Sequence, residues 1–188
     1  HRAYVWQRQE TPELVEAVRK SGRFSRLLFL AAEIDPNSPE RPHFLLENFD
    51  YVRQSPREIG LCIRIRELQG RFSGQPDALN AVLGTLRELQ KRARSSGIVV
   101  SEWQLDDDAP ESGLEDYAAL LRAALAVASS LTFTALPTWL KRKEAFSDLV
   151  GAADGFVLQL HGWDLEASRP EAMRVLDLGR LERWVDQA

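Results

Sequence analysis

A chain of 188 residues with 44% hydrophobic and 28% charged side chains is long enough to form one globular domain with a large core. Its net charge of −4 argues against a nucleic-acid-binding face, and the sequence holds no apolar run of about 18 residues that could span a membrane. The single cysteine, Cys62, excludes an internal disulfide and any metal site built from several cysteines.

Short apolar segments alternate with helical patterns, which predicts βα units and a parallel sheet. In chain order we expect a strand at 3–8, a helix at 12–20, a strand at 27–34, a short helix at 44–53, a strand at 60–65, a helix at 76–95, a strand within 98–108, a helix at 114–128, a strand at 131–135, a helix at 141–152, a strand at 155–160 and a helix at 178–187. Two helix starts carry local signals. Thr11 is a suitable N-cap before Pro12, and Ser112 with Glu115 fits a capping box.

The number of βα units indicates the fold. Six units of roughly 30 residues correspond to most of a TIM barrel, whose eight units usually need about 250 residues. We therefore expect residues 1–188 to form one parallel α/β, (β/α) barrel-like domain that is truncated at its C-terminal end. An open doubly wound sheet is the competing architecture. The first and last strands would leave open edges, which invite association. We therefore expect one of three arrangements: the natural chain continues, a loop or another chain covers the gap, or the protein dimerises through these edges.

The strand within 98–108 ends in three consecutive carboxylates followed by Ala109 and Pro110. Alternate side chains of a strand share a face, so Gln104, Asp106 and Asp108 project together and Asp107 projects oppositely with Trp103 and Leu105. Two carboxylates on one face repel each other unless a cation, a ligand or a proton uses them. The pattern predicts a functional pair, and Asp107 is interpreted as structural.

Other strands also end in polar side chains, and functional residues of α/β proteins lie at the carboxyl ends of strands. The candidate binding residues at these ends are Glu33, Arg64, Gln104, Gln159 and His161. Each has a structural alternative. Strand-end charges can cap helices, Arg64 can be a counter-ion for Glu33 or Asp106 rather than a substrate clamp, and His161 can be a core histidine.

Two tryptophans, Trp139 and Trp163, follow the strands at 131–135 and 155–160. Exposed aromatic rings there would stack against the apolar faces of sugar rings. The alternative is that both rings pack their own loops. Trp103 is expected to pack under a helix.

A metal site built from Asp106, Asp108 and His161 is a third class of function. No closely spaced pair of histidines supports it, and we expect neither a metal nor another cofactor.

Several segments resemble a bacterial family known as domain of unknown function 3142. They are residues 3–8 (AYVWQR), 30–35 (LAAEID), 104–110 (QLDDDAP), 136–140 (LPTWL) and 158–162 (LQLHG). The resemblance covers essentially the whole chain, which looks like the first three quarters of the family's domain. It implies a longer, often lipoprotein-type protein in the bacterial periplasm or cell envelope, with any signal segment outside this chain.

The chain is also distantly similar to chitinase-like TIM-barrel glycoside hydrolases. In that pattern Gln104, Asp106 and Asp108 take the last three alternating positions of the fourth strand. The resemblance gives Asp108 the place of the general acid and Asp106 that of its supporting carboxylate. Three departures stand out. The acid is the shorter Asp, Gln104 replaces an acidic residue, and Gln159 and His161 stand where a tyrosine is usual.

Two hypotheses follow. The first is a glycoside hydrolase-like domain acting on an envelope or extracellular polysaccharide, in which Asp106 favours the protonated form of Asp108. The second is a non-catalytic carbohydrate-binding or assembly module on the same scaffold. In both, the expected ligand is a carbohydrate.

Overall fold

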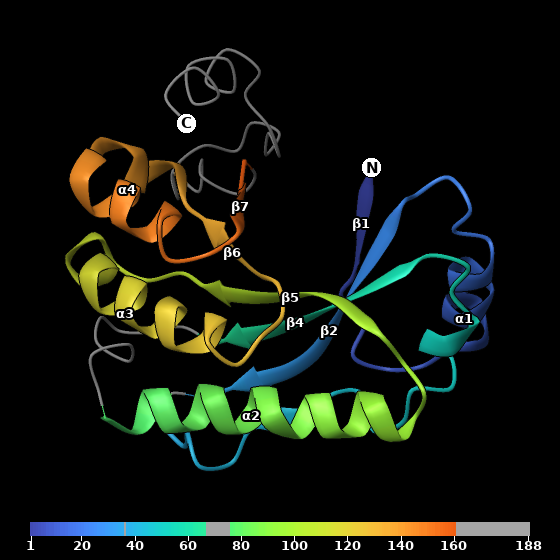
Figure 1. The fold of residues 1–188 in the computed structure, drawn as a ribbon. Helices are drawn as coiled ribbons and strands as arrows, with labels where there is room; N and C mark the ends of the chain where they lie inside the picture. The colour runs from blue at the N-terminus through green and yellow to red at the C-terminus, as the bar shows by residue number, and fades with distance from the viewer. Residues whose placement is uncertain (36, 67–75, 161–188) are drawn as a thin grey trace, which may run out of the picture.

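A computed structural model describes residues 1–35, 37–66 and 76–160. They form one parallel sheet with flanking helices (Figure 1). The strands are β1 (Arg2–Val5), β2 (Arg26–Ile34), β4 (Glu58–Ile65), β5 (Val100–Asp107), β6 (Leu131–Ala135) and β7 (Gly155–Leu158), and β3 (His43–Phe44) pairs antiparallel with β2. The parallel strands lie side by side in chain order. A doubly wound sheet would reverse that order, so the prediction of an incomplete barrel is confirmed.

Within residues 1–35, 37–66 and 76–160, four α-helices and three short 3₁₀ helices connect the strands. They are α1 (Pro12–Arg19), α2 (Pro76–Ser95), α3 (Leu114–Leu125), α4 (Lys143–Val150), η1 (Val52–Gln54), η2 (Glu111–Gly113) and η3 (Pro137–Lys141). Thr11 caps α1 as predicted, because its Oγ1 accepts a hydrogen bond from the amide of Leu14 at 3.2 Å. Gly97, with φ of 70°, follows α2 in the left-handed conformation that favours glycine.

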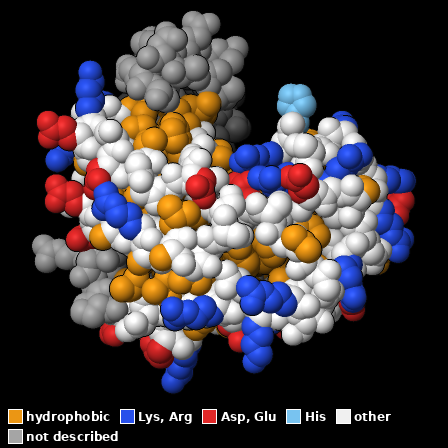
Figure 2. Space-filling model, viewed as in Figure 1, with side chains coloured by type: hydrophobic (Ala, Val, Ile, Leu, Met, Phe, Trp, Pro, Cys, Tyr) orange, Lys and Arg blue, Asp and Glu red, His pale blue; other side chains and the backbone are white. Residues whose placement is uncertain are grey.

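The apolar core lies between the sheet and these helices. Its buried members alternate along the strands and face the helices, as expected for a strand period of two. They include Phe29, Ile63, Trp103, Leu105 and Phe133 from the strands, and Val82, Leu86, Leu89, Tyr117 and Leu121 from the helices. Trp103 therefore packs in the helix-facing core as predicted. Charged side chains of both signs are spread over the outer surface of the helices (Figure 2).

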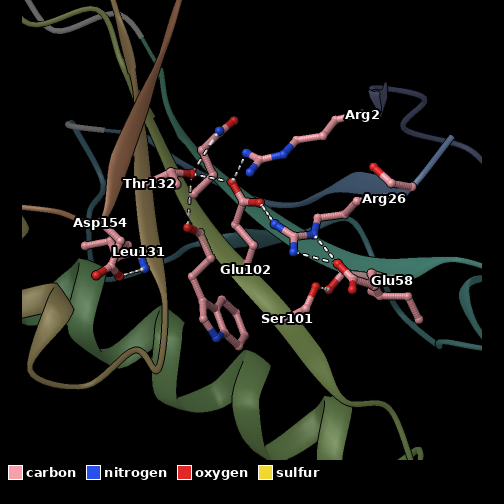
Figure 3. Close-up of polar contacts among 12 residues, drawn as sticks. Arg2, Arg26, Glu58, Ser101, Glu102, Leu131, Thr132 and Asp154 are labelled. Atoms are coloured by element: carbon pink, nitrogen blue, oxygen red, sulfur yellow. Dashed lines mark hydrogen bonds and ion pairs between the residues drawn. The ribbon is translucent and has the colours of Figure 1, made fainter.

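The opposite face of the sheet is concave, and ion pairs centred on the buried Glu102 cross its base (Figure 3). The Nη1 atom of Arg2 on β1 lies 3.0 Å from Oε1 of Glu102 on β5, although β2 and β4 separate these strands. Three strand spacings would cover about 14 Å in a flat sheet, so this contact requires a strong curl. Arg26 on β2 pairs with the same carboxylate and also with Glu58.

Gly60 makes room at this level of the sheet. A Cβ atom at that position would lie 3.0 Å from Cγ of Leu28 and 3.4 Å from the backbone oxygen of Glu102. The curl brings the inward side chains of neighbouring strands close together, and glycine avoids a collision there.

Two local predictions are wrong. Residues 44–53 do not form one helix, because the segment starts as β3, the amide of Leu45 donates to the carbonyl of Ala31 on β2, and helical structure begins only with η1 at Val52. Ser112 does not cap α3, because it lies within η2 and α3 begins after Gly113. The helix predicted at 178–187 and part of the predicted 1–188 domain lie outside the described residues.

Candidate active site

Asp106 is the centre of a polar cluster at the carboxyl end of β5. Its side chain is buried, and its Oδ1 accepts hydrogen bonds from Thr134 Oγ1 at 2.6 Å and from Gln159 Nε2 at 3.1 Å. Its Oδ2 lies 3.6 Å from Nε of Arg64. The two hydrogen-bond donors come from β6 and the end of β7, and the cation comes from β4, so the order of the strands in the sheet assembles the cluster.

Burial is the main influence on the protonation of Asp106. It raises the pKa of this carboxyl above its usual value, and the negative charge of Asp108 raises it further. The hydrogen bonds from Thr134 and Gln159 and the charge of Arg64 act in the opposite direction. Burial and a neighbouring charge thus oppose hydrogen bonds and a cation in setting the pKa of Asp106. Carboxyls with a perturbed pKa are common at functional sites.

Asp108 follows the last residue of β5, and its side chain is exposed. No hydrogen bond or ion pair of its carboxyl is present among residues 1–35, 37–66 and 76–160. The two predicted catalytic carboxyls therefore occupy different environments, because Asp106 is held by three neighbours and Asp108 is open to a ligand.

Asp107 is more unusual than its sequence position suggested. Its side chain is almost fully buried, and neither carboxyl oxygen has a hydrogen-bond partner in the part of the chain that the structure describes. Burial, with the charges of Asp108 and Asp106, raises its pKa to about 8. Its environment thus favours the protonated carboxyl, and by strand alternation its side chain lies on the opposite face of β5 from Asp106.

Glu33 and Arg64 lie beside Asp106 in register. Glu33 on β2 is opposite Arg64 on β4, and Arg64 is opposite Asp106 on β5. Arg8 Nη2 donates to Oε1 of the buried Glu33 at 2.5 Å. Glu33 thus has its own counter-ion, and the contact of Arg64 is with Asp106.

Gln104 lies deeper on the same face of β5. Its Nε2 donates to Oγ1 of Thr132 at 3.1 Å, and this hydroxyl donates to Oε1 of Glu102 at 2.7 Å. Its Oε1 is buried without a partner among the described residues. These hydrogen bonds connect Gln104 through Thr132 to Glu102 at the base of the sheet, so Gln104 supports the floor of the candidate site.

The prediction that Trp139 offers an exposed stacking surface is wrong. The side chain is fully buried, its Nε1 donates to the carbonyl of Ala109 at 3.0 Å, and its ring meets that of Tyr117 edge to face. Its sequence position is right, but η3 folds back and places the ring in the core. His161 and Trp163 lie outside the described residues.

Three residues at this end of the sheet were not singled out from the sequence as site residues. They are Trp6, Arg8 and Thr134. Trp6 is half-buried and stacks on Tyr4 with ring centroids 5.5 Å apart and an interplanar angle of 8°. The alternation of Tyr4, Trp6 and Arg8 along the first strand is a signal that could have identified two of them.

Two classes of feature are absent from the described part of the chain. It holds no group of three or more His, Cys, Asp or Glu side chains arranged to bind a metal ion. Among its helices, none combines the length and the apolar character needed to cross a membrane.

Comparison with solved structures identifies chitinases with the same fold. A mutant class V chitinase from Nicotiana tobaccum in complex with NAG4 is 16% identical with a TM-score of 0.56, and the match covers 85% of this chain and 51% of the chitinase. The same enzyme without the mutation is 15% identical with a TM-score of 0.55, and the match covers 85% of this chain and 51% of the chitinase. A mutant GH18 chitinase from Cycas revoluta in complex with (GlcNAc)4 is 12% identical with a TM-score of 0.51. That match covers 86% of this chain and 55% of the chitinase. The chain thus spans about half the length of these chitinases, and the likeness supports the incomplete TIM-barrel fold.

Sequence comparison gives a complementary result. No curated protein matches the chain. Residues 60–188 match the sequence model of the family described as Domain of unknown function (DUF3142), which includes the cluster residues from Arg64 to Gln159. The chain belongs to this family.

Proposed function

We propose that this chain is part of a glycoside hydrolase that cleaves an envelope or extracellular polysaccharide of a bacterium. The observation that carries the proposal is the pair Asp106 and Asp108 at the carboxyl end of β5, where one carboxyl is buried and oriented and the other is exposed. Pairs of carboxyl groups in different environments are what acid-catalysed glycoside cleavage requires.

Asp108 is the general acid in this proposal. It gives its proton to the glycosidic oxygen as the bond between that oxygen and C1 breaks. Asp106, Glu33 or an acetamido group of the substrate stabilises the positive charge that develops at C1. Water then adds to C1, and the proton that it loses restores Asp108.

The surrounding residues have separate tasks. Thr134 and Gln159 orient Asp106, and Arg64 balances its charge. Trp6 offers a ring for stacking at the end of β1, while His161 and Trp163 complete the proposed binding residues.

The test compares Asp108→Asn and Asp106→Asn with Asp116→Asn, an exposed acid on α3 that serves as a matched control. Hydrolysis of (GlcNAc)4 and of bacterial polysaccharides is measured by release of reducing ends. We expect Asp108→Asn to lower the rate by at least about 100-fold, the scale of general acid catalysis, and Asp116→Asn to leave it unchanged. Unchanged hydrolysis by Asp108→Asn would contradict the assignment.

A second candidate is a non-catalytic carbohydrate-binding or assembly module. It is favoured by Gln104, an uncharged residue at the floor of the site, and by the short side chain of Asp108. Glycan binding without turnover, lost on substitution of Trp6 or Trp163 but kept in Asp108→Asn, would support it. Dimerisation through the edge strands β1 and β7 belongs to this candidate and is tested by sedimentation.

A further inference from the structure

Two arginines on the concave face of the sheet, Arg26 and Arg64, differ in how many carboxylate contacts they make. Arg26 is largely buried, and all three nitrogens of its guanidinium contact carboxylates, with Nε at 3.1 Å and Nη2 at 2.6 Å from Glu58 and Nη1 on Glu102. Arg64 is 40% exposed, and its one described contact is from Nε to Asp106 at 3.6 Å. That distance is too long for a hydrogen bond, so the guanidinium of Arg64 donates no hydrogen bond to residues 1–35, 37–66 or 76–160.

The position of Arg64 makes these donors significant. It lies on β4, between Glu33 on β2 and Asp106 on β5, at the mouth of the concave face. A counter-ion devoted to Asp106 would bind it as closely as Arg26 binds Glu58. The oxygen of Asp106 that accepts two hydrogen bonds is the other one, Oδ1. Arg64 therefore lies next to the proposed reaction centre, and its contact with Asp106 does not occupy its hydrogen-bond donors.

A second arginine follows on the same face of the strand. Arg66 is two residues beyond Arg64, and its side chain is exposed. Its backbone amide donates to the carbonyl of Ile34 at 2.9 Å, which holds the end of β4 beside β2. Arg64 and Arg66 thus place two cationic residues at the end of β4, in a chain whose net charge is −4.

We propose that Arg64, assisted by Arg66, binds an anionic substituent on the sugar that occupies the site. The substrate is thus an acidic polysaccharide. This inference rests on the proposed function, since it concerns the same site. A guanidinium fork matches the two oxygens of a carboxylate or a sulfate, which makes uronic acids and sulfated sugars the chemical class. Because Arg64 adjoins Asp106, the acidic group belongs to the sugar at the reaction centre.

The test uses pairs of oligosaccharides that differ in one charged group. A tetramer of glucuronate is compared with the matching tetramer of glucose, and 6-O-sulfated (GlcNAc)4 with (GlcNAc)4, by calorimetric titration of the protein at two salt concentrations. The two pairs distinguish carboxylate from sulfate. We expect the acidic member of at least one pair to bind about tenfold more tightly, with the difference reduced at higher salt.

Arg64→Gln and Arg66→Gln are compared with Arg87→Gln, an exposed arginine on α2. The preference for the acidic sugar should disappear in Arg64→Gln, shrink in Arg66→Gln and stay in Arg87→Gln. Equal binding of both members of each pair by the unmodified protein overturns the inference, as does a preference that survives in Arg64→Gln. Turnover of (GlcNAc)4 with no charge preference leaves the proposed function standing, whereas binding of no saccharide overturns both.

Discussion

The hydroxyl of Thr134 and the side-chain amide of Gln159 donate to the same oxygen of Asp106, at 2.6 and 3.1 Å. Asp106 is thereby fixed in orientation, and its second oxygen lies toward Arg64. Two donors on one oxygen restrict the carboxyl in the way that preorganised catalytic groups require.

Loss of the Thr134 hydroxyl should change the pH dependence of hydrolysis. Its hydrogen bond lowers the pKa of Asp106 against the effect of burial, so Thr134→Val should raise that pKa further. If Asp106 acts as an anion, the acidic limb of the rate profile moves to higher pH, and the rate on that limb falls. The control is Thr85→Val on α2, which removes a buried hydroxyl bonded to Ala81. An unshifted acidic limb in Thr134→Val would show that the hydroxyl does not act through Asp106.

Asp107 should make the protein less stable as the pH rises. Its pKa is raised from 3.8 to about 8 in the folded chain, so its contribution to stability is complete below about pH 4 and is lost between there and pH 8. Asp107→Asn removes this titration. Chemical denaturation should show that Asp107→Asn gains up to about 4 kcal/mol relative to the unmodified protein between pH 4 and pH 7. A constant difference between the two proteins across this range would contradict a buried, proton-binding Asp107.

Glu102 should be essential for the curl of the sheet. Its carboxylate is completely buried and binds Arg2, Arg26 and Thr132. Glu102→Gln leaves Arg26 without its full set of partners, and we expect a loss of about 3 kcal/mol in the free energy of unfolding. Glu88→Gln, which breaks a partly exposed pair with Arg92 on α2, is the matched control and should have a much smaller effect. Similar losses for the two variants would refute a special role of the buried network.

Substitution of Trp139 should lower stability, whereas substitution of Trp6 should weaken sugar binding. Trp139→Phe removes the hydrogen bond to Ala109 and should lower the free energy of unfolding by about 1–2 kcal/mol without changing affinity for sugars. Trp6→Ala should weaken sugar binding while the protein stays folded. Thermal melting and titration with (GlcNAc)4 on both variants check this. Weaker sugar binding by Trp139→Phe with unchanged binding by Trp6→Ala would show that Trp139, and not Trp6, contacts the sugar.

The sequence by itself determined the elements and the faces of the strands. A helical pattern predicted α2 with its observed bounds, and β6 was likewise predicted at 131–135. The period of two separated Gln104 and Asp106 from Trp103, Leu105 and Asp107. These features depend on residues a few positions apart, which is why local patterns contain them.

Only the tertiary structure decided which side chains meet. Thr134 and Gln159 lie 28 and 53 residues from Asp106, and Arg2 lies 100 residues from Glu102. Such contacts depend on the order, register and curl of the strands, which no local pattern specifies. The burial of Trp139 and the isolation of the Asp107 carboxyl depend in the same way on how helices pack over strand ends. Alternation can assign a side chain to a face, but packing decides whether that face meets solvent, a partner or the core.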